Sequence, residues 1–347
     1  MRANRLGSSR VCVTELSFGA ASIGGLYAPV SHATARATVQ AAWDAGIRCF
    51  DTAPHYGLGV SEQRLGAALR NYPREAYVVS TKVGRILEPV ERPDGDDLAN
   101  GFAVPASYRR RWDFTAAGVE RSLAESLGRL GLDRIDIVYL HDPDEHAEQA
   151  LGEAYPALEK LRDQGVIGAV GVGMNQAVIP ARFVRETAID VVLLAGRYTL
   201  LDQSGLDDLL PAAEEHGVSV VIGGVFNSGI LADPRSGRTY DYGAVPPGVL
   251  TRALRMQALC EKYGTSLRSA ALQFPFGHRA VRSVLIGARS PGEMRDAVEQ
   301  AGQPIPVQLW HELRASGLLA ENVPLPENVP LPESVAPADE TRQATPS

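Results

Sequence analysis

The sequence has few cysteines, no long hydrophobic runs and no excess of positive charge. Its three cysteines, Cys12, Cys49 and Cys260, are far apart and form no C-x-x-C pair. This spacing indicates neither a disulfide framework nor a zinc site, and a reducing, cytoplasmic environment is the expectation that fits it.

Membranes and nucleic acids are both disfavoured as partners. Val191–Ala195 is among the longest apolar stretches, and it is far too short to cross a bilayer. The first ten residues, MRANRLGSSR, contain bases but no apolar signal-peptide segment. Acidic residues outnumber basic residues by 41 to 34, which is not typical of a nucleic-acid binder.

The C-terminal end has an unusual composition. Residues 321–347 repeat ENVPLP in tandem, contain six prolines, and carry −4 of the formal net charge of −7. Proline removes amide donors and favours polyproline II, so we predict a disordered tail over 321–347, and we favour an inert tail over a regulatory or partner-docking one. One nearly neutral domain over 1–320 remains.

Short apolar runs alternate with amphipathic segments along that domain. At Gly46, Gly131, Gly165 and Gly217 a helical pattern ends in glycine and an aliphatic run begins, which is typical of a tight helix-to-strand turn. Residues 115–130 have helical spacing of leucine and valine. We predict eight strands, at 16–18, 47–50, 77–79, 135–140, 166–172, 191–194, 218–222 and 284–286. Repeating units of about 35 residues favour a (β/α)₈ TIM barrel over a doubly wound sheet.

Polar and glycine-rich residues directly follow nearly every predicted strand, where barrel enzymes place their active sites. Asp51, Tyr56, Lys82 and His141 come from three consecutive strand ends or their loops. Each alone is typical of an ordinary surface or turn residue. Their joint placement instead predicts one shared pocket and an enzyme.

The four side chains suggest acid–base chemistry. A lysine at ~4 Å from a tyrosine, at an effective dielectric near 20, favours the phenolate by about 4 kcal/mol and predicts a Tyr56 pKa of about 7 to 8. Tyr56 is then the general acid or base. Asp51 is expected to orient Lys82, and His141 to donate a hydrogen bond to a substrate oxygen.

Four sequence blocks carry a family resemblance. FDTAPHYG (50–57), STKVG (80–84), LGLDRIDIVYLHDPD (130–144) and GVIGAVGVGMN (165–175) resemble, in order and spacing, blocks of the aldo-keto reductase family. The resemblance extends over nearly all of residues 5–315. It implies a (β/α)₈ barrel, a nicotinamide dinucleotide at the C-terminal mouth, and a catalytic tetrad of Asp51, Tyr56, Lys82 and His141.

The resemblance also implies a cofactor site built by residues that follow the later strands. They are Asn175, Gly223, Gly224, Phe226, Asn227, Gly229, Gly287, Arg289 and Ser290. Glycine-rich loops that lead into a helix also suit a pyrophosphate physically. Met174, Ala195 and Gly223 replace a serine, a glutamine and an aromatic residue of many members, so the cofactor packing is expected to differ. Arg289 is the single base near the place of a 2′-phosphate, so we favour NAD over NADP, with no metal.

For the substrate, VVLLAGRYTLLDQ (191–203) and SVLIGARSPGEM (283–294) resemble the branch that includes D-threo-aldose 1-dehydrogenases and pyridoxal 4-dehydrogenases. This branch oxidises cyclic hemiacetals to lactones. Candidate substrate contacts are Trp112, Asp113, Arg197, Tyr198 and Asn227. The alternatives are a pyridoxal 4-dehydrogenase, a broad aldehyde or ketone reductase, and a non-catalytic cofactor-sensing subunit.

Three other patterns are given less weight. Gly171 and Gly173 begin a Rossmann-like fingerprint, but Gln176 occupies the place of its third glycine. The run at 109–111 has three arginines, which we interpret as a solvated face or a pocket wall. His141 and His146 lack zinc-ligand spacing. The reaction direction and the oligomeric state remain open.

Overall fold

The computed structural model describes residues 1–326 except 237, 238 and 242. Eight parallel strands close into a barrel, each hydrogen-bonded to its neighbours, which confirms the (β/α)₈ prediction. In order around the barrel they are β3 (Leu16–Gly19), β4 (Cys49–Asp51), β5 (Val78–Val83), β10 (Ile137–His141), β11 (Ala169–Met174), β12 (Val191–Ala195), β13 (Ser219–Gly223) and β14 (Val281–Gly287).

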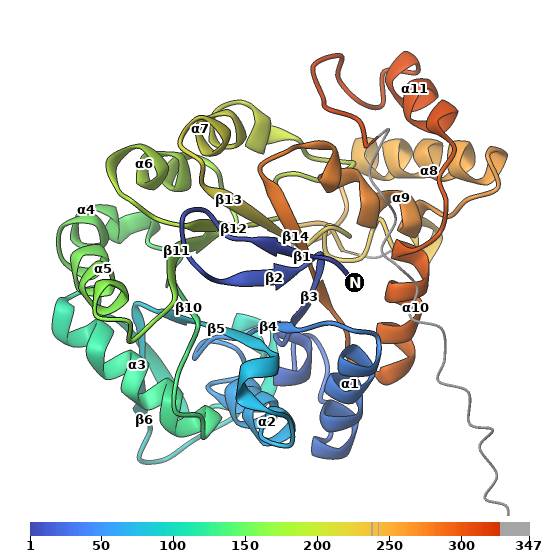
Figure 1. Cartoon of the computed structure of the whole chain (residues 1–347). Coiled ribbons are helices and arrows are strands. Elements are labelled where there is room, and N and C mark those ends of the chain that lie inside the picture. The colour runs from blue at the N-terminus through green and yellow to red at the C-terminus, as the bar shows by residue number, and fades with distance from the viewer. Residues whose placement is uncertain (237–238, 242, 327–347) are drawn as a thin grey trace, which may run out of the picture.

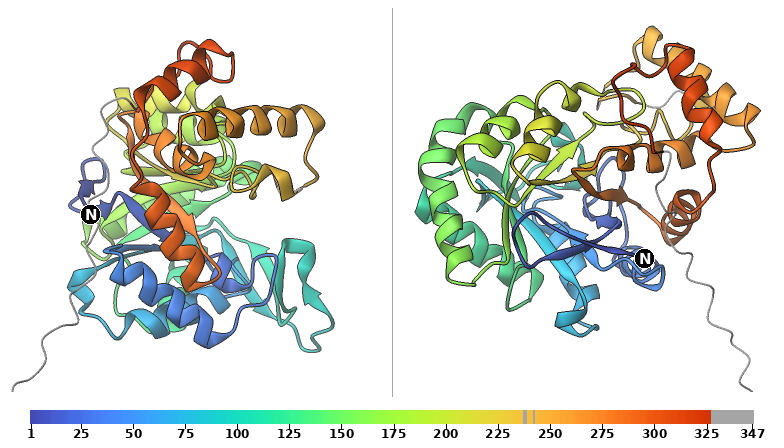
Figure 2. Two further views of the ribbon diagram at one scale, coloured as in Figure 1. Left: turned by 90° about the vertical axis from the view of Figure 1, so that its right-hand side faces the viewer. Right: turned by 45° about the horizontal axis from the view of Figure 1, so that its top comes forward.

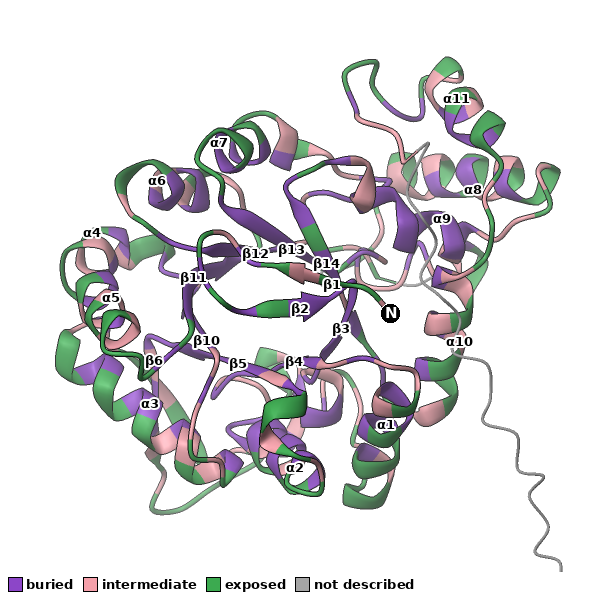
Figure 3. Ribbon diagram, viewed as in Figure 1, coloured by how far each residue is buried: buried purple, intermediate pink, exposed green. Residues whose placement is uncertain are grey.

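Helices surround the strands (Figure 1), with their outer faces exposed and the strands buried (Figure 3). They are α1 (His32–Asp44), α2 (Val60–Leu69), α3 (Ala116–Leu130), α4 (Ala147–Gln149), α5 (Tyr155–Asp163), α6 (Val178–Glu186), α7 (Leu209–Glu215), α8 (Pro247–Lys262), α9 (Leu267–Gln273), α10 (Pro291–Ala301) and α11 (Val307–Ala315). The alternation of apolar runs and amphipathic segments in the sequence is therefore reproduced in space.

The predicted glycine turns are confirmed. Gly46, Gly131, Gly165 and Gly217 all have positive φ, between 61° and 85°. Helix α3 begins after Thr115, whose side chain accepts a hydrogen bond from the Gly118 amide. Because these signals depend on local backbone sterics, they could be read without knowledge of the tertiary structure.

The strand boundaries differ from the prediction in one consistent way. Asp51, Lys82 and His141 lie within β4, β5 and β10, whereas the predicted strands stopped at the last apolar residue. Backbone pairing continues through these polar residues because their side chains are buried inside the barrel rather than in solvent. The functional side chains therefore stand on rigid strands.

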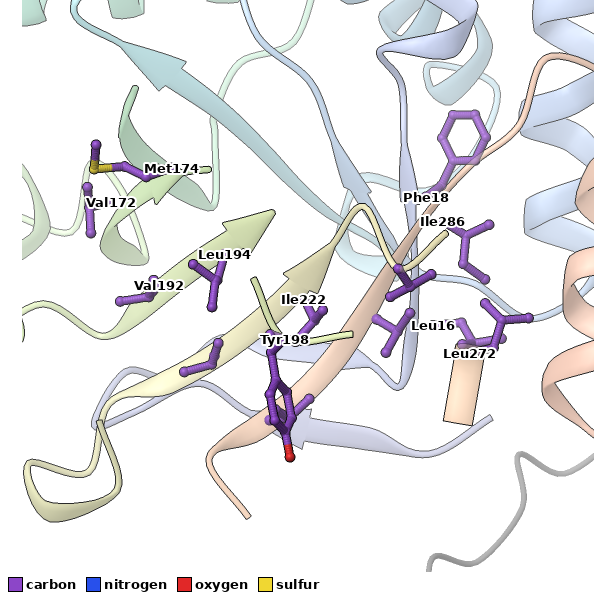
Figure 4. Close-up of a cluster of buried hydrophobic side chains, with 14 of the residues drawn as sticks. Leu16, Phe18, Val172, Met174, Val192, Leu194, Tyr198, Ile222, Leu272 and Ile286 are labelled. Carbon is purple, nitrogen blue, oxygen red and sulfur yellow. The ribbon is translucent and has the colours of Figure 1, made fainter. Parts of the chain in front are cut away.

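Two layers of apolar side chains form the core. One lies between the strands and the helices, and Figure 4 shows part of it, with Tyr198 among aliphatic side chains. The other lies inside the barrel, where Leu6 and Val13 of the N-terminal segment pack against Tyr139 and Leu193. This segment forms the hairpin of β1 (Ala3–Arg5) and β2 (Cys12–Thr14), seen across the barrel in Figure 1. The hairpin closes the N-terminal end of the barrel.

A folded insertion follows β5, which the sequence did not predict. It pairs β6 (Arg85–Pro89) with β9 (Tyr108–Trp112), and β7 (Asp96–Asp97) with β8 (Phe102–Pro105). Figure 2, left, shows it projecting on the side of the barrel away from the N-terminus. Arg110 anchors it, since its guanidinium pairs with Asp97 and donates to the His55 carbonyl over 2.9 Å. Arg109 and Arg111 pair with Glu88 at the surface, so the arginine run mainly holds the hairpin together.

The C-terminal boundary also differs from the prediction. Val323, in the first ENVPLP copy, is 1% exposed, and its carbonyl accepts a hydrogen bond from Arg314. Residues 321–326 therefore belong to the folded body, because their apolar side chains cover the core. The rest of the predicted tail, 327–347, lies outside the described residues. Within the described part of the chain, no helix has both the length and the apolar character to span a membrane.

Close packing between α2 and α3 gives a stability test. A Cβ added at Gly66 would stand 1.9 Å from the Leu130 carbonyl oxygen, whereas Gly128, exposed on α3, has open space around that position. We predict that Gly66→Ala lowers the free energy of unfolding by about 3 kcal/mol through overpacking. Gly128→Ala should raise it by about 0.5–1 kcal/mol. Urea denaturation measures both, and equal effects of the two substitutions would contradict this packing.

Candidate active site

The barrel brings the four predicted catalytic residues together. Asp51 ends β4, Lys82 lies on β5, and His141 ends β10, and these three strands are neighbours in the sheet. Tyr56 comes from the loop between β4 and α2. Its ring packs beside an apolar cluster of the insertion that includes Phe102, 6.0 Å away between centroids.

A buried ion pair forms the floor of this site. Lys82 Nζ donates to Asp51 Oδ2 over 2.6 Å and to the Thr52 carbonyl over 2.9 Å. Ser80 donates to the other Asp51 oxygen over 2.7 Å. The two charged side chains are only 1% and 3% exposed. Since every one of these contacts joins β4 or its loop to β5, the pair is fixed by the barrel itself.

The Tyr56 and His141 rings lie over this pair. Lys82 Nζ is 4.8 Å from the centre of the Tyr56 ring, and the Tyr56 and His141 rings are 5.8 Å apart at 88°. His55 stacks edge-on to His141 at 5.6 Å. A substrate oxygen between the phenol and the imidazole would therefore be within reach of both.

The pKa of Tyr56 differs from the sequence-based prediction of 7 to 8. Burial raises it well above 10, and the Asp51 and Asp142 carboxylates raise it further, while Arg85 lowers it. The prediction was wrong because it counted the Lys82 charge and left out burial, the largest cause of the shift, and the nearby carboxylates. Asp51 is in direct contact with that ammonium and offsets its field at the phenol. Tyr56 is thus a neutral phenol at neutral pH.

Both histidines of the site are uncharged at neutral pH. Burial and the nearby Arg85 and Lys82 cations hold the pKa of His141 well below its usual 6.5. The same causes, burial first, lower the pKa of His55 to about 2. A neutral imidazole can donate one hydrogen bond to a substrate oxygen without competing for its proton.

Sequence reasoning missed two charged residues of this site. Arg85 pairs with Asp142, and the Asp142 carboxylate is 3.6 Å from His141 Nε2. Arg85 directly follows the block STKVG, and Asp142 lies inside the block LGLDRIDIVYLHDPD, directly after His141. Their position beside the tetrad was therefore visible in the sequence, but their contact with each other was not.

The residues expected to hold a cofactor lie on the rim of the barrel, where the later strands of the chain end. Gly223 and Gly287 end β13 and β14, and a Cβ at Gly223 would come no closer than 3.8 Å to any neighbour. Gly224 and Gly229 have positive φ, which permits a tight loop. Ser290 caps α10 by accepting from the Glu293 amide, so a helix N-terminus opens directly at this rim.

Three other cofactor candidates have defined surroundings. Asn175 follows β11 and is exposed. Phe226 is partly buried against the core. The Asn227 side chain is buried, accepts from Thr199 over 2.6 Å and donates to the Gly196 carbonyl over 3.2 Å. Asn227 therefore joins two rim loops.

Among the predicted substrate contacts, Trp112 is 42% exposed and lies under the Arg85 guanidinium, 4.3 Å from it. Tyr198 is fully buried against Phe274, so its prediction was wrong.

The other two predicted substrate contacts, Asp113 and Arg197, form hydrogen bonds and ion pairs within the protein. Asp113 accepts from Thr115 at the start of α3. Arg197 donates to the Asn175 carbonyl over 2.7 Å and pairs with Asp202 and Asp241. Asp113 therefore supports the start of α3, and Arg197 links the loops that carry Asn175, Asp202 and Asp241.

Comparison with known proteins identifies the family. Residues 15–316 match the model of the Aldo/keto reductase family. The chain belongs to this family. It is an NAD(P)-dependent oxidoreductase, and the resemblance noted in the sequence blocks is confirmed.

Individual relatives of this reductase cover nearly its whole length. It is 46% identical over 314 residues to a D-threo-aldose 1-dehydrogenase from Pseudomonas sp., covering 89% of this chain and 95% of the relative. It is 42% identical over 333 residues to a pyridoxal 4-dehydrogenase from Microbacterium luteolum, covering 91% and 97%. A solved aldo-keto reductase from Bacillus halodurans superposes with a TM-score of 0.72 at 25% identity, covering 93% and 98%.

The reductase acts on small molecules, as its relatives do. Within residues 1–326, apart from the three undescribed positions, no group of histidine, cysteine and acidic side chains is arranged to hold a metal ion.

The floor of the site gives a second stability prediction. Asp51→Asn leaves the Lys82 ammonium buried without its counter-ion, so we expect the free energy of unfolding to fall by about 3–5 kcal/mol. Arg121→Gln breaks the exposed Arg121–Glu125 pair and should cost about 0.5 kcal/mol or less. Chemical denaturation of both variants measures the difference. A loss in Asp51→Asn no larger than in the control would show that Lys82 does not depend on its partner.

Proposed function

We propose that this reductase is an aldose 1-dehydrogenase, which oxidises the cyclic hemiacetal of sugars such as L-fucose or D-arabinose to a lactone with NAD. The observation that carries the proposal is the convergence of Tyr56 and His141 over the buried Asp51–Lys82 pair. The choice of an aldose is supported by the 46% identity to a D-threo-aldose 1-dehydrogenase.

In this proposal the anomeric hydroxyl of the sugar lies between the two rings. Tyr56, as the phenolate, removes its proton as the general base, and the neutral His141 imidazole holds the oxygen by one hydrogen bond. Asp51 holds the Lys82 ammonium 4.8 Å from the Tyr56 ring, and the part of the Lys82 charge that Asp51 does not offset stabilises the phenolate as the proton is exchanged. Bound nicotinamide dinucleotide supplies the hydride acceptor for the sugar carbon.

The rim of the barrel fits such a dinucleotide. Gly223, Gly224 and Gly287 leave the rim free of side chains where a pyrophosphate would approach the backbone. The N-terminus of α10 favours an anion there. Asn175, held through its carbonyl by Arg197, is the proposed contact of the nicotinamide carboxamide.

The preference for NAD follows from charge at the same helix. Arg289 pairs with Glu293 over 3.0 Å, and the Arg289 amide also donates to this carboxylate over 2.8 Å. The one base expected near a 2′-phosphate is therefore already neutralised. Glu293 would in addition repel a phosphate dianion, which disfavours NADP.

A substrate panel tests this function directly. We expect the wild-type enzyme to oxidise L-fucose and D-arabinose faster with NAD than with NADP, and to act more slowly on pyridoxal. Tyr56→Phe should lower kcat by about 10³-fold or more, because the base is lost, while NAD binding measured by fluorescence quenching stays unchanged. Faster turnover of pyridoxal than of aldoses would favour the pyridoxal 4-dehydrogenase alternative, in line with the 42% identical relative. NAD binding without turnover of any substrate would favour a sensing subunit.

The raised pKa of Tyr56 predicts different pH profiles for the two directions. Oxidation needs the phenolate, which is scarce at neutral pH, so kcat/KM for L-fucose should rise up to tenfold per pH unit between about pH 7 and 9. Reduction of an aldehyde such as 4-nitrobenzaldehyde by NADH uses the neutral phenol, and its kcat/KM should stay nearly constant over that range. Steady-state rates in both directions provide the check. An oxidation rate independent of pH would show that Tyr56 is not the base.

A further inference from the structure

Two charged residues outside the tetrad adjoin the reacting centre. Arg85 begins β6, directly after the strand that bears Lys82, and Asp142 directly follows His141. Their side chains pair through Arg85 Nη2 and Asp142 Oδ2, and they are 12% and 26% exposed. The same Asp142 oxygen is 3.6 Å from His141 Nε2. The pair therefore lies beside the place where the substrate oxygen is bound.

The structure holds both groups firmly. Asp142 has a φ of +43°, which is unfavourable for a residue other than glycine, and its amide donates to the Gly173 carbonyl over 3.0 Å. The Arg85 guanidinium lies 4.3 Å from the centre of the Trp112 ring, which fixes its plane. Unfavourable backbone conformations of this kind concentrate at functional sites, where the surrounding structure maintains them.

Arg85 also has unused hydrogen-bonding capacity. Its Nε is buried and has no hydrogen-bond partner within the described structure. An unsatisfied buried donor is costly, and one on a charged group more so. The Nε atoms of Arg64, Arg74, Arg110 and Arg314 are unpartnered in the same way, so what distinguishes Arg85 is its pairing with Asp142 beside His141.

We propose that Arg85 and Asp142 bind ring hydroxyls next to the reacting carbon and so select polyhydroxylated hemiacetals. A guanidinium can only donate hydrogen bonds and a carboxylate can only accept them, whereas a hydroxyl does both. Two neighbouring hydroxyls of a sugar ring can therefore satisfy both side chains at once. A substrate without them leaves a buried charged pair without its ligand, which is a strong basis for discrimination. This inference rests on the proposed aldose dehydrogenase function.

The test compares two hemiacetals that differ only in their ring substituents. L-fucose carries ring hydroxyls, and tetrahydropyran-2-ol has the same reacting group without them. The variants are Arg85→Met, which keeps an unbranched side chain over Trp112, and Asp142→Asn, since asparagine tolerates positive φ. The measured quantity is the ratio of kcat/KM for L-fucose to that for tetrahydropyran-2-ol. Changes in the pKa of Tyr56 affect both substrates alike and cancel in this ratio.

We expect each variant to lower the ratio about 30-fold or more, mainly through kcat/KM for L-fucose, while turnover of tetrahydropyran-2-ol persists. Arg109→Met, on the same hairpin but at the surface, is the matched control and should leave the ratio unchanged. Equal losses on both substrates in the two variants would overturn the inference and leave the proposed function standing. A wild-type enzyme that oxidises tetrahydropyran-2-ol but no aldose would overturn both this inference and the proposed aldose dehydrogenase function.

Discussion

The buried contact between Asp51 and Lys82 is the constraint on which the site depends. Two opposite charges that are almost fully removed from water must stay together, since separating them leaves an unpaired charge in the protein interior. Because the two residues stand on adjacent strands, the pair ties the chemistry to the barrel. Tyr56 and His141 are then placed around a fixed ammonium.

The same contact determines the proton chemistry. A lysine alone would make Tyr56 a ready base at neutral pH, but the paired lysine does not, and burial then raises the pKa of the phenol. In the proposed mechanism, Tyr56 is therefore an acid at neutral pH and becomes a base as the pH rises. The Arg85 charge also affects these groups, since it lowers the pKa of both Tyr56 and His141.

Sequence patterns predicted well what depends on short segments. The eight strands follow from apolar runs, and the turns at Gly46 and Gly131 follow from backbone sterics. The direction of individual side chains was not predictable in this way. Tyr198 adjoins a strand end as Tyr56 adjoins another, yet its ring is buried against Phe274. Arg197 had the right chemistry for a substrate contact but is engaged in holding Asn175.

The sequence by itself determined the barrel, the family and the four tetrad positions, because these are recorded in hydrophobic periodicity and in contiguous motifs. Tertiary structure alone decided which charges meet. Asp51 and Lys82 offset each other, and Arg85 reaches Asp142 although the two lie on different strands or their extensions. Electrostatic energies depend on distance and burial in three dimensions, and neither is contained in the order of residues along the chain.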